Sequence, residues 1–281
     1  MIRTNDIQAR LARLDNDAAL DAPEQWRARA QVLEWMENAW PQLAANAVAP
    51  VLRSRLERAD DRLHRRLRAA VRAGQGQALF QRWRQESSAT PRAIDGEDYD
   101  ELDELVAGVL RLADPGTELL PLAPGMVFYQ PTPARHVLDM LARCGPGPRE
   151  VLVDLGSGLG HVPMLAALCT GARAVGVEWQ PAYVACARRA ARALSLDGVR
   201  FVAGDARDAD LSEGTLFFLY TPFGGSVLRE VLDALRAQAT RRPIRLCTFG
   251  PCSRIVAGET WLRADGPPAP DRAVVFDAVV P

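Results

Sequence analysis

The stretch VLVDLGSGLGHV, residues 151–162, decides the fold class of this chain. An apolar run ends at Asp154, and glycines follow at positions 156, 158 and 160. Glycines after a buried strand permit a tight turn, and they let backbone N–H groups approach a ligand at the positive end of the following helix. The stretch therefore predicts a β-strand, a ligand-binding glycine turn and an α-helix, in that order.

From residue 150 onward, short β-rich runs alternate with helical segments. After the glycine turn come the strand-like runs ARAVGVE, VRFVAGDA, TLFFLY and IRLCTFG, and the segments between them have helical spacing. Such alternation is typical of a doubly wound α/β fold, in which a mostly parallel sheet has helices on both faces. Two further strand-like pieces, at about 257–264 and 273–280, follow near the C-terminus.

The N-terminal part of the chain is predicted to be all α-helical. Apolar residues between Leu52 and Val71 recur at helical spacing, and arginines lie largely on the other faces of that helix. The segments at about 5–20 and 23–40 have a similar pattern. We therefore expect about three to five helices before residue 90.

A connector follows this helical part. The stretch from Gln85 to Asp103 is polar and acidic, and a proline-rich stretch follows a short predicted helix at about 98–112. Helical spacing resumes at about 134–143. We expect three regions, which are listed here by residue number: an N-terminal helical domain (1–93), a connector and lid segment (94–148) and a catalytic α/β domain (149–281).

The composition is that of a folded protein with a sizeable core. The chain has 281 residues, of which 48% are hydrophobic, with 34 basic and 35 acidic side chains. This length suits one large domain or two smaller ones, and it excludes a small scaffold that depends on disulfides or a metal. No apolar run reaches the roughly 18 residues that a membrane-spanning helix needs. Because the N-terminus has no compact apolar segment of the signal-peptide kind, we expect a cytoplasmic protein without membrane insertion.

Every basic residue is an arginine, and the chain contains no lysine. Residues 1–93 carry 16 arginines against 11 acidic residues, whereas residues 94–281 carry 18 against 24. The two parts therefore differ in charge, and we expect them to differ in role. Five cysteines lie apart without a C-x-x-C pair, which predicts free thiols and no metal site.

Two further acidic residues follow the second and third predicted strands. Glu178 closes ARAVGVE, and Asp205 lies at the end of FVAGDA. Because the carboxyl ends of parallel strands meet at one edge of a sheet, these two and Asp154 are expected to converge on one crevice, where a carboxylate can accept hydrogen bonds from ribose hydroxyls. Each acid taken singly could equally cap the helix that follows it.

Residues 126 to about 250 resemble class I S-adenosylmethionine-dependent methyltransferases. The segments that carry the resemblance are DLGSGLG, the acid Glu178, the pair Asp205 and Ala206, and TLFFLYTPF. The resemblance implies a seven-stranded sheet that ends in an antiparallel hairpin, and S-adenosylmethionine as the cofactor. The residues that it implies for cofactor binding in these segments are Asp154, Gly156, Ser157, Gly158, Gly160, Glu178, Asp205 and Ala206.

A nicotinamide-dependent oxidoreductase is the competing interpretation of the glycine turn. Its motif also pairs a glycine-rich turn with an acid about 20 residues further on. The G-x-G-x-G spacing and Asp205 after the third strand favour the methyltransferase.

The segment before the glycine turn, MVFYQPTPARHVLDML, extends the resemblance. It is similar to the segment that precedes this turn in the disruptor-of-telomeric-silencing histone lysine methyltransferases and in the ATP-synthase c-subunit lysine methyltransferases. By this resemblance Tyr129 and Thr132 lie over the cofactor, and the hydroxyl of Thr132 binds its carboxylate or its amine. The simpler alternative is a proline-rich crossing segment in which Tyr129 only packs.

The fourth predicted strand ends in Tyr220, Thr221, Pro222 and Phe223, where the histone enzymes have Asn-Asn-Phe. We expect Phe223 to line a narrow acceptor channel, and Tyr220 to hydrogen-bond near the transferred methyl group. Together with Tyr129 these two form the predicted catalytic set. Methyl transfer from a sulfonium is a direct displacement, so alignment of the nucleophile and exclusion of water can carry much of the catalysis.

A base would help only where the acceptor arrives protonated, and the chain has three histidines. His161 directly follows the glycine turn, and His136 lies one helical turn beyond Thr132. Either could serve as the base, although a helix-capping or packing role is the simpler interpretation. His64 lies among arginines and is expected to be exposed to solvent.

The leading hypothesis is methyl transfer from S-adenosylmethionine to a protein side chain or a small-molecule nucleophile. An NAD-dependent oxidoreductase and a catalytically silent cofactor-binding adaptor are the alternatives. The arginine-rich segment 53–72 could bind nucleic acid, but acidic residues interleave with its arginines, so we expect a solvated helix face and no nucleic-acid partner. Because the chain has no lysine, any lysine acceptor must belong to a partner.

Overall fold

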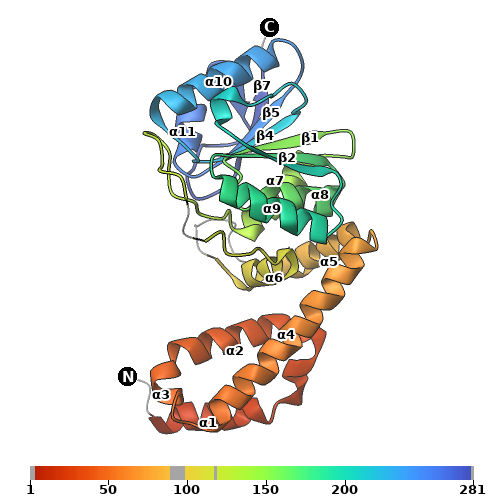
Figure 1. Cartoon of the computed structure of the whole chain (residues 1–281), viewed down its shortest axis with the longest axis vertical. Helices are drawn as coiled ribbons and strands as arrows, with labels where there is room; N and C mark the ends of the chain where they lie inside the picture. The colour runs from red at the N-terminus through yellow and green to blue at the C-terminus, as the bar shows by residue number, and fades with distance from the viewer. Residues whose placement is uncertain (1–3, 89–98, 117–118, 280–281) are drawn as a thin grey trace. The chain divides into compact units, whose positions relative to one another are not determined.

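The computed structural model describes residues 4–88, 99–116 and 119–279. Its contacts divide the chain into two compact units, each built from two stretches of sequence (Figure 1). The helical unit takes in Met1–Ala69 and Tyr99–Val109, and the sheet unit takes in Ala70–Asp98 and Leu110–Pro281. These limits differ from the predicted boundaries at residues 93 and 148, because α6 (Glu101–Leu110), a helix within the predicted connector and lid segment, packs with the N-terminal helices. The predicted three-region division stays a prediction.

The sheet unit contains a seven-stranded sheet in the order β3-β2-β1-β4-β5-β7-β6. The first five strands of this order pair in parallel, and β7 pairs antiparallel with both β5 and β6. The predicted α/β fold class is therefore confirmed. The strands are β1 (Val151–Leu155), β2 (Arg173–Glu178), β3 (Val199–Ala203), β4 (Leu216–Tyr220), β5 (Arg245–Phe249), β6 (Leu262–Ala264) and β7 (Val274–Ala278).

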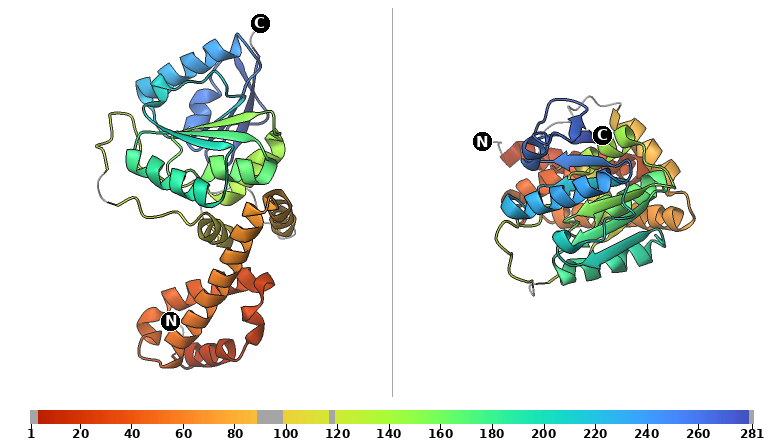
Figure 2. Two further views of the ribbon diagram at one scale, coloured as in Figure 1. Left: turned by 45° about the vertical axis from the view of Figure 1, so that its right-hand side comes forward. Right: turned by 90° about the horizontal axis from the view of Figure 1, so that it is seen from above.

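Helices cover both faces of this sheet (Figure 2). The helices α7, α8 and α9 lie on one face and α10 lies on the other, as Figure 1 shows by label. All five residues of β1 are buried, as expected of a central parallel strand with helices on both sides. The helices of this unit are α5 (Gly76–Ser88), α7 (Ala134–Cys144), α8 (His161–Thr170), α9 (Pro181–Ala193), η3 (Ala206–Asp208), α10 (Gly225–Ala239) and α11 (Cys252–Val256).

The C-terminal hairpin is shorter than the sequence pattern predicts. The predicted strand at 257–264 is wrong over most of its length, because only Leu262–Ala264 pairs with β7. The residues before β6 form a turn in which the indole of Trp261 is buried and donates a hydrogen bond to the Glu259 carboxylate. The second predicted piece, 273–280, contains β7.

The helical unit is built from short helices around one long one. Its elements are α1 (Thr4–Asp15), η1 (Ala18–Asp21), η2 (Pro23–Gln25), α2 (Trp26–Asn38), α3 (Trp40–Leu43), α4 (Val48–Arg72) and α6 (Glu101–Leu110). The limits of the unit fall within α4, at Ala69, and within α6, at Val109. The predicted helix at 5–20 is wrong beyond Asp15, since the Asp17 side chain accepts a hydrogen bond from the Ala19 N–H and begins a separate 3-10 turn. Within the described residues, no helix is long and apolar enough to cross a membrane.

A buried arginine joins three elements of the helical unit. The Arg29 side chain is fully buried, and its Nε donates to the Asp60 carboxylate of α4 at 2.6 Å. Its Nη1 donates to the backbone carbonyls of Leu20 and Ala22, at 2.8 and 2.5 Å. These bonds tie α2 to α4 and to the 3-10 turns that interrupt the predicted helix.

The expectation that His64 is exposed is wrong. Its side chain is half-buried because Gly108 of α6 leaves room for the imidazole ring, which an added Cβ at Gly108 would meet at 2.2 Å. Burial lowers the pKa of His64, although the carboxylates of Asp60 and Asp61 act in the opposite direction. The sequence pattern of α4 alone could not show that α6 packs on this ring.

Candidate functional site

A cavity of about 360 Å³ lies in the sheet unit, where β1, β2 and β4 end. It is lined by residues of the lid segment, the glycine turn and the ends of these strands. The predicted site residues that line it are Tyr129, Thr132, Asp154, Gly156, Ser157, Glu178, Asp205, Ala206, Tyr220 and Phe223. The crevice expected from the strand ends therefore exists.

The Glu178 carboxylate is held by backbone N–H groups. One of its oxygens accepts a hydrogen bond from Gly158 N–H and the other accepts one from Gln180 N–H, both at 2.8 Å. The side chain is buried, and desolvation raises its pKa while these N–H donors act to lower it. Glu178 thus links the glycine turn to the end of β2 and presents a fixed carboxylate to the cavity.

Asp154 is buried beside Glu178. Burial raises the pKa of Asp154 well above its usual range, and the charge of Glu178 raises it further. Among the residues that the structure describes, no arginine lines the cavity. The described lining thus offers Asp154 and Glu178 no guanidinium partner.

Asp205 lies in a different environment from the other two acids. Its carboxylate accepts a hydrogen bond from Arg207 N–H and so caps η3, which is the capping role weighed from the sequence. It also pairs with the Arg207 guanidinium at 2.8 Å, which lowers the pKa of Asp205. Asp205 therefore combines a cap with a position on the cavity wall.

Two of the predicted glycines lie outside the cavity lining. Gly158 has a φ of 52°, and a Cβ there would lie 1.9 Å from a ring carbon of Tyr129. Gly160 has a φ of 86°, and a Cβ there would lie 2.5 Å from the Phe201 ring. Only glycine fits the backbone conformation and the close packing at these two positions. Because these two glycines have no side chain, they leave room for the rings of Tyr129 and Phe201.

The lid segment is paired with the turn that follows β4. Gly224 N–H donates to Gly125 C=O at 2.7 Å, and Met126 and Phe223 form an isolated antiparallel bridge. This pairing holds Tyr129 and Phe223 on two neighbouring segments of the cavity wall. The sequence pattern placed both residues in the site but did not predict the pairing.

The turn after β4 contains a strained residue. Thr221 has a φ of 34°, in a region that a β-branched residue rarely occupies. Its hydroxyl donates to Phe249 C=O at 3.1 Å and accepts from Cys252 N–H at 3.2 Å, so it joins the ends of β4 and β5. These two bonds hold the backbone conformation that directs Tyr220 and Phe223 to the cavity wall.

The two remaining histidines differ in their relation to the cavity. His136 is buried, lies outside the cavity lining and packs on the Phe249 ring at a centroid distance of 4.3 Å. His161 lines the cavity, and its Nδ1 lies 3.0 Å from the Tyr129 hydroxyl. Desolvation lowers the pKa of His161 to about 4, so its imidazole is neutral at neutral pH.

Sequence reasoning missed one wall of the cavity. The buried side-chain amide of Gln180 accepts from Leu120 N–H and donates to Leu120 C=O, both at 2.7 Å. The neighbouring Trp179 indole donates to Pro121 C=O at 3.3 Å. The sequence signal that could have pointed to this wall is the position of Trp179 and Gln180, which directly follow Glu178 at the end of β2.

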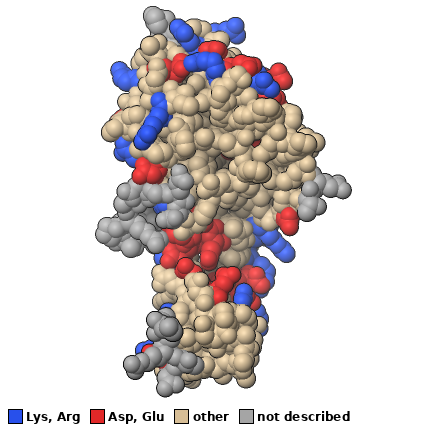
Figure 3. Space-filling view, turned by 90° about the vertical axis from the view of Figure 1, so that its left-hand side faces the viewer, with Lys and Arg blue, Asp and Glu red and all other residues tan. Residues whose placement is uncertain are grey.

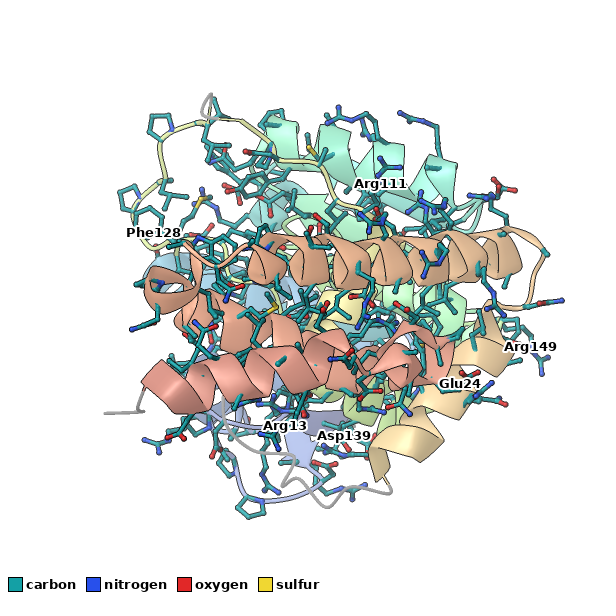
Figure 4. The ribbon with its side chains drawn as sticks, turned by 90° about the horizontal axis from the view of Figure 1, so that it is seen from below. Arg13, Glu24, Arg111, Phe128, Asp139 and Arg149 are labelled. Atoms are coloured by element: carbon teal, nitrogen blue, oxygen red, sulfur yellow. The ribbon has the colours of Figure 1, made fainter. Side chains whose placement is uncertain are left out.

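The rim of the cavity is apolar. Phe128, labelled in Figure 4, is 88% exposed, and its neighbour Val127 and the segment Leu119–Leu122 also expose apolar side chains. On the face shown in Figure 3, the sheet unit has a broad area without charged side chains. The site therefore combines an acidic interior with an apolar entrance.

Comparison with known proteins agrees with this geometry. The family model "Histone methylation protein DOT1" matches residues 127–198, which include the last part of the lid segment, the glycine turn and Glu178. A search of curated proteins found no match.

Solved structures of methyltransferases are similar to part of the chain. An RNA methyltransferase from Salinibacter ruber in complex with S-adenosyl-L-homocysteine is 30% identical, over 54% of this chain and 94% of that one, with a TM-score of 0.43. A precorrin-6y C5,15-methyltransferase from Geobacter metallireducens is 16% identical, over 55% of this chain and 93% of that one, with a TM-score of 0.41. A tRNA (uracil-54, C5)-methyltransferase from Pyrococcus abyssi in complex with S-adenosyl-L-homocysteine is 16% identical, over 54% of this chain and 40% of that one, with a TM-score of 0.40. The strand order and the family-model match together support a class I S-adenosylmethionine-dependent methyltransferase.

Proposed function

We propose that the chain transfers a methyl group from S-adenosylmethionine to a protein side chain or a small-molecule nucleophile, within the cavity of the sheet unit. The observation that carries this proposal is the pair of buried carboxyl groups, Asp154 and Glu178, in a cavity whose described lining contains no arginine. Such a cavity suits a ligand that offers hydroxyl donors and a positive charge.

The charge of the cavity favours S-adenosylmethionine. This cofactor carries a sulfonium and an ammonium group, which the Glu178 carboxylate attracts. NAD carries a pyrophosphate, which dinucleotide-binding folds hold at the N-terminus of the helix after the glycine turn, so an acid that binds the ribose is common to both interpretations. The G-x-G-x-G spacing and Asp205 after β3 therefore carry the preference over the oxidoreductase alternative.

The residues present fit the cofactor, as an unsatisfied polar atom indicates. Within the described part of the chain, the buried Ser157 hydroxyl lines the cavity and has no hydrogen-bond partner. A polar group without a partner costs free energy, which a bound ligand can recover. We assign Glu178 to the ribose, Asp205 with Ala206 to the adenine, and Tyr129 with Thr132 to the methionine end.

The bound cofactor supplies an electrophilic methyl group, and this chain's residues align the acceptor. Tyr220 and Phe223 frame the path of the nucleophile at the end of β4. His161 is a poor general base, because its pKa is lowered to about 4, and His136 lies outside the lining. Catalysis therefore depends on positioning and exclusion of water, which suits an acceptor that arrives unprotonated.

Calorimetric titration with S-adenosylmethionine, S-adenosylhomocysteine and NAD tests the proposal. We expect heat of binding with both sulfur compounds and none with NAD. Binding of NAD alone would overturn the assignment in favour of the oxidoreductase.

Methyl transfer itself needs a second experiment. The protein is incubated with cofactor labelled in its methyl group and a lysate of the source cell, and the label is followed into proteins and into small molecules. Label in either fraction identifies the acceptor class. Cofactor binding without label in any fraction would favour the silent adaptor module. Because the chain has no lysine, a labelled lysine must belong to another protein.

A further inference from the structure

A hydrogen bond joins the lid segment to the first residue of α8. The Tyr129 hydroxyl and the His161 Nδ1 lie 3.0 Å apart, and both residues line the cavity. His161 directly follows the glycine turn, so this bond connects the lid to the same turn that Glu178 holds from β2.

The ring of Tyr129 is already confined by its neighbours. It packs so closely on Gly158 that a Cβ there would lie 1.9 Å from its Cε2 atom, and its centroid lies 5.2 Å from that of Tyr183. These contacts position the ring, and the hydroxyl forms a hydrogen bond with His161 Nδ1. The hydrogen bond therefore directs the polar end of Tyr129.

The state of His161 limits what it can do. Its pKa is lowered to about 4 by desolvation, so at neutral pH it is an uncharged imidazole that neither stores a proton nor repels a cationic ligand. A neutral imidazole still offers one ring nitrogen to a hydroxyl. The role that remains is a hydrogen-bonding one.

We infer that His161 is a positioning residue that acts through Tyr129, by fixing the phenol hydroxyl against the cofactor part of the cavity. This inference rests on the proposed function, since it takes the cavity to hold S-adenosylmethionine. It assigns to His161 a role other than that of the base considered from the sequence.

A double-mutant cycle on S-adenosylhomocysteine affinity tests the inference without knowledge of the acceptor. Tyr129→Phe removes the hydroxyl and keeps the ring, and His161→Leu removes the ring nitrogen. We expect each change to weaken binding by roughly threefold to tenfold, the usual effect of one lost hydrogen bond. Because both changes break the same bond, the double variant should bind within about twofold of the weaker single variant.

Two matched variants separate positioning from simple packing. The side-chain amide of His161→Asn lies at the distance of Nδ1 from the backbone, whereas that of His161→Gln lies at the distance of Nε2. We expect His161→Asn to restore affinity to within about twofold of the unchanged protein and His161→Gln to leave it reduced. If circular dichroism shows that His161→Leu does not fold, the comparison of the Asn and Gln variants tests the inference without it.

The outcomes distinguish this inference from the proposed function. Absence of binding by the unchanged protein would overturn both. Binding by the unchanged protein, combined with independent and multiplying effects of Tyr129→Phe and His161→Leu, would overturn the positioning role alone. Equal affinities of the Asn and Gln variants would likewise contradict it.

Discussion

The two units of the molecule bury charged side chains in opposite ways. The helical unit buries Arg29 against the Asp60 carboxylate and two backbone carbonyls. The sheet unit buries Asp154 and Glu178 side by side, with no cationic partner among the described residues. The first arrangement compensates a buried charge within the fold, whereas the second leaves charge that a ligand can compensate.

This difference separates a structural charge from a functional one. Removal of one member of a buried ion pair destabilises a protein, because the other member stays buried and unpaired. Burial and the charge of Glu178 instead raise the pKa of Asp154, and carboxyl groups perturbed in this way mark candidate binding sites. Variants of Arg29 should therefore change the free energy of unfolding, and variants of Glu178 should chiefly change ligand affinity.

The largest expected effect is on the stability of the helical unit. Arg29→Met removes three hydrogen bonds, to the partly buried Asp60 carboxylate and to the carbonyls of Leu20 and Ala22, and we expect the free energy of unfolding to fall by about 3–5 kcal/mol. Urea denaturation followed by circular dichroism measures it. Arg58→Met, at an exposed position of α4, is the control and should change the same quantity by less than about 0.5 kcal/mol. Equal effects of the two substitutions would contradict the assigned role of Arg29.

The next effect is on cofactor affinity. Glu178→Ala removes a carboxylate that faces the cavity, and we expect S-adenosylhomocysteine to bind more weakly by about 1–3 kcal/mol, because a charge-assisted hydrogen bond is lost. Calorimetric titration measures the change. Glu213→Ala removes an exposed carboxylate that lies 3.6 Å from Arg173 and Arg200, and it should leave affinity unaltered. A Glu178→Ala protein that binds as well as the unchanged one would show that this acid is wrongly assigned.

A third effect concerns pH. The folded protein holds the Asp154 proton more tightly than the unfolded chain does, so this group stabilises the fold at low pH and the contribution is lost as pH rises from about 4 toward the raised pKa. The decline can reach about 1.4 kcal/mol per pH unit for one proton. Asp154→Asn cannot ionise, and its free energy of unfolding should decline less over the same interval. Denaturation curves at a series of pH values compare the two, and parallel declines would refute the prediction.

The smallest effect is expected at Asp205. Its carboxylate already pairs with the partly exposed Arg207, so a ligand must compete with that pair. We expect Asp205→Ala to weaken S-adenosylhomocysteine binding by only about threefold, and less at high salt, because exposed charge pairs are screened. Titrations at low and high salt measure this. A loss as large as that of Glu178→Ala would remove the distinction between the two acids.

Much of the site could be predicted because its residues are tied to strand ends. Asp154 and Glu178 lie within or at the end of β1 and β2, and parallel pairing brings these ends together whatever the rest of the chain does. The capping role of Asp205 was among the alternatives, since Asp is a common cap. The sequence could not predict which groups bind each carboxylate, namely the backbone N–H groups of Gly158 and Gln180 at Glu178 and the Arg207 guanidinium at Asp205.

Other features depended on contacts between distant segments. Two hydrogen bonds between the Gln180 side-chain amide and the Leu120 backbone join residues far apart in sequence, and neither residue belongs to a recognisable motif. The burial of His64 depends on Gly108 in α6, a helix within the predicted connector and lid segment. Local periodicity describes one helix or strand at a time, so it cannot report such pairs.

The sequence by itself determined the strand, glycine turn and helix around residues 151–162, and with them the α/β fold class, because alternating hydrophobic patterns and glycine conformations are local properties. Only the tertiary structure decided that Tyr129 meets His161 and that Arg29 meets Asp60. It also decided that Asp154 and Glu178 face a cavity whose described lining has no arginine. Those outcomes depend on desolvation and on distances between segments, which packing alone sets.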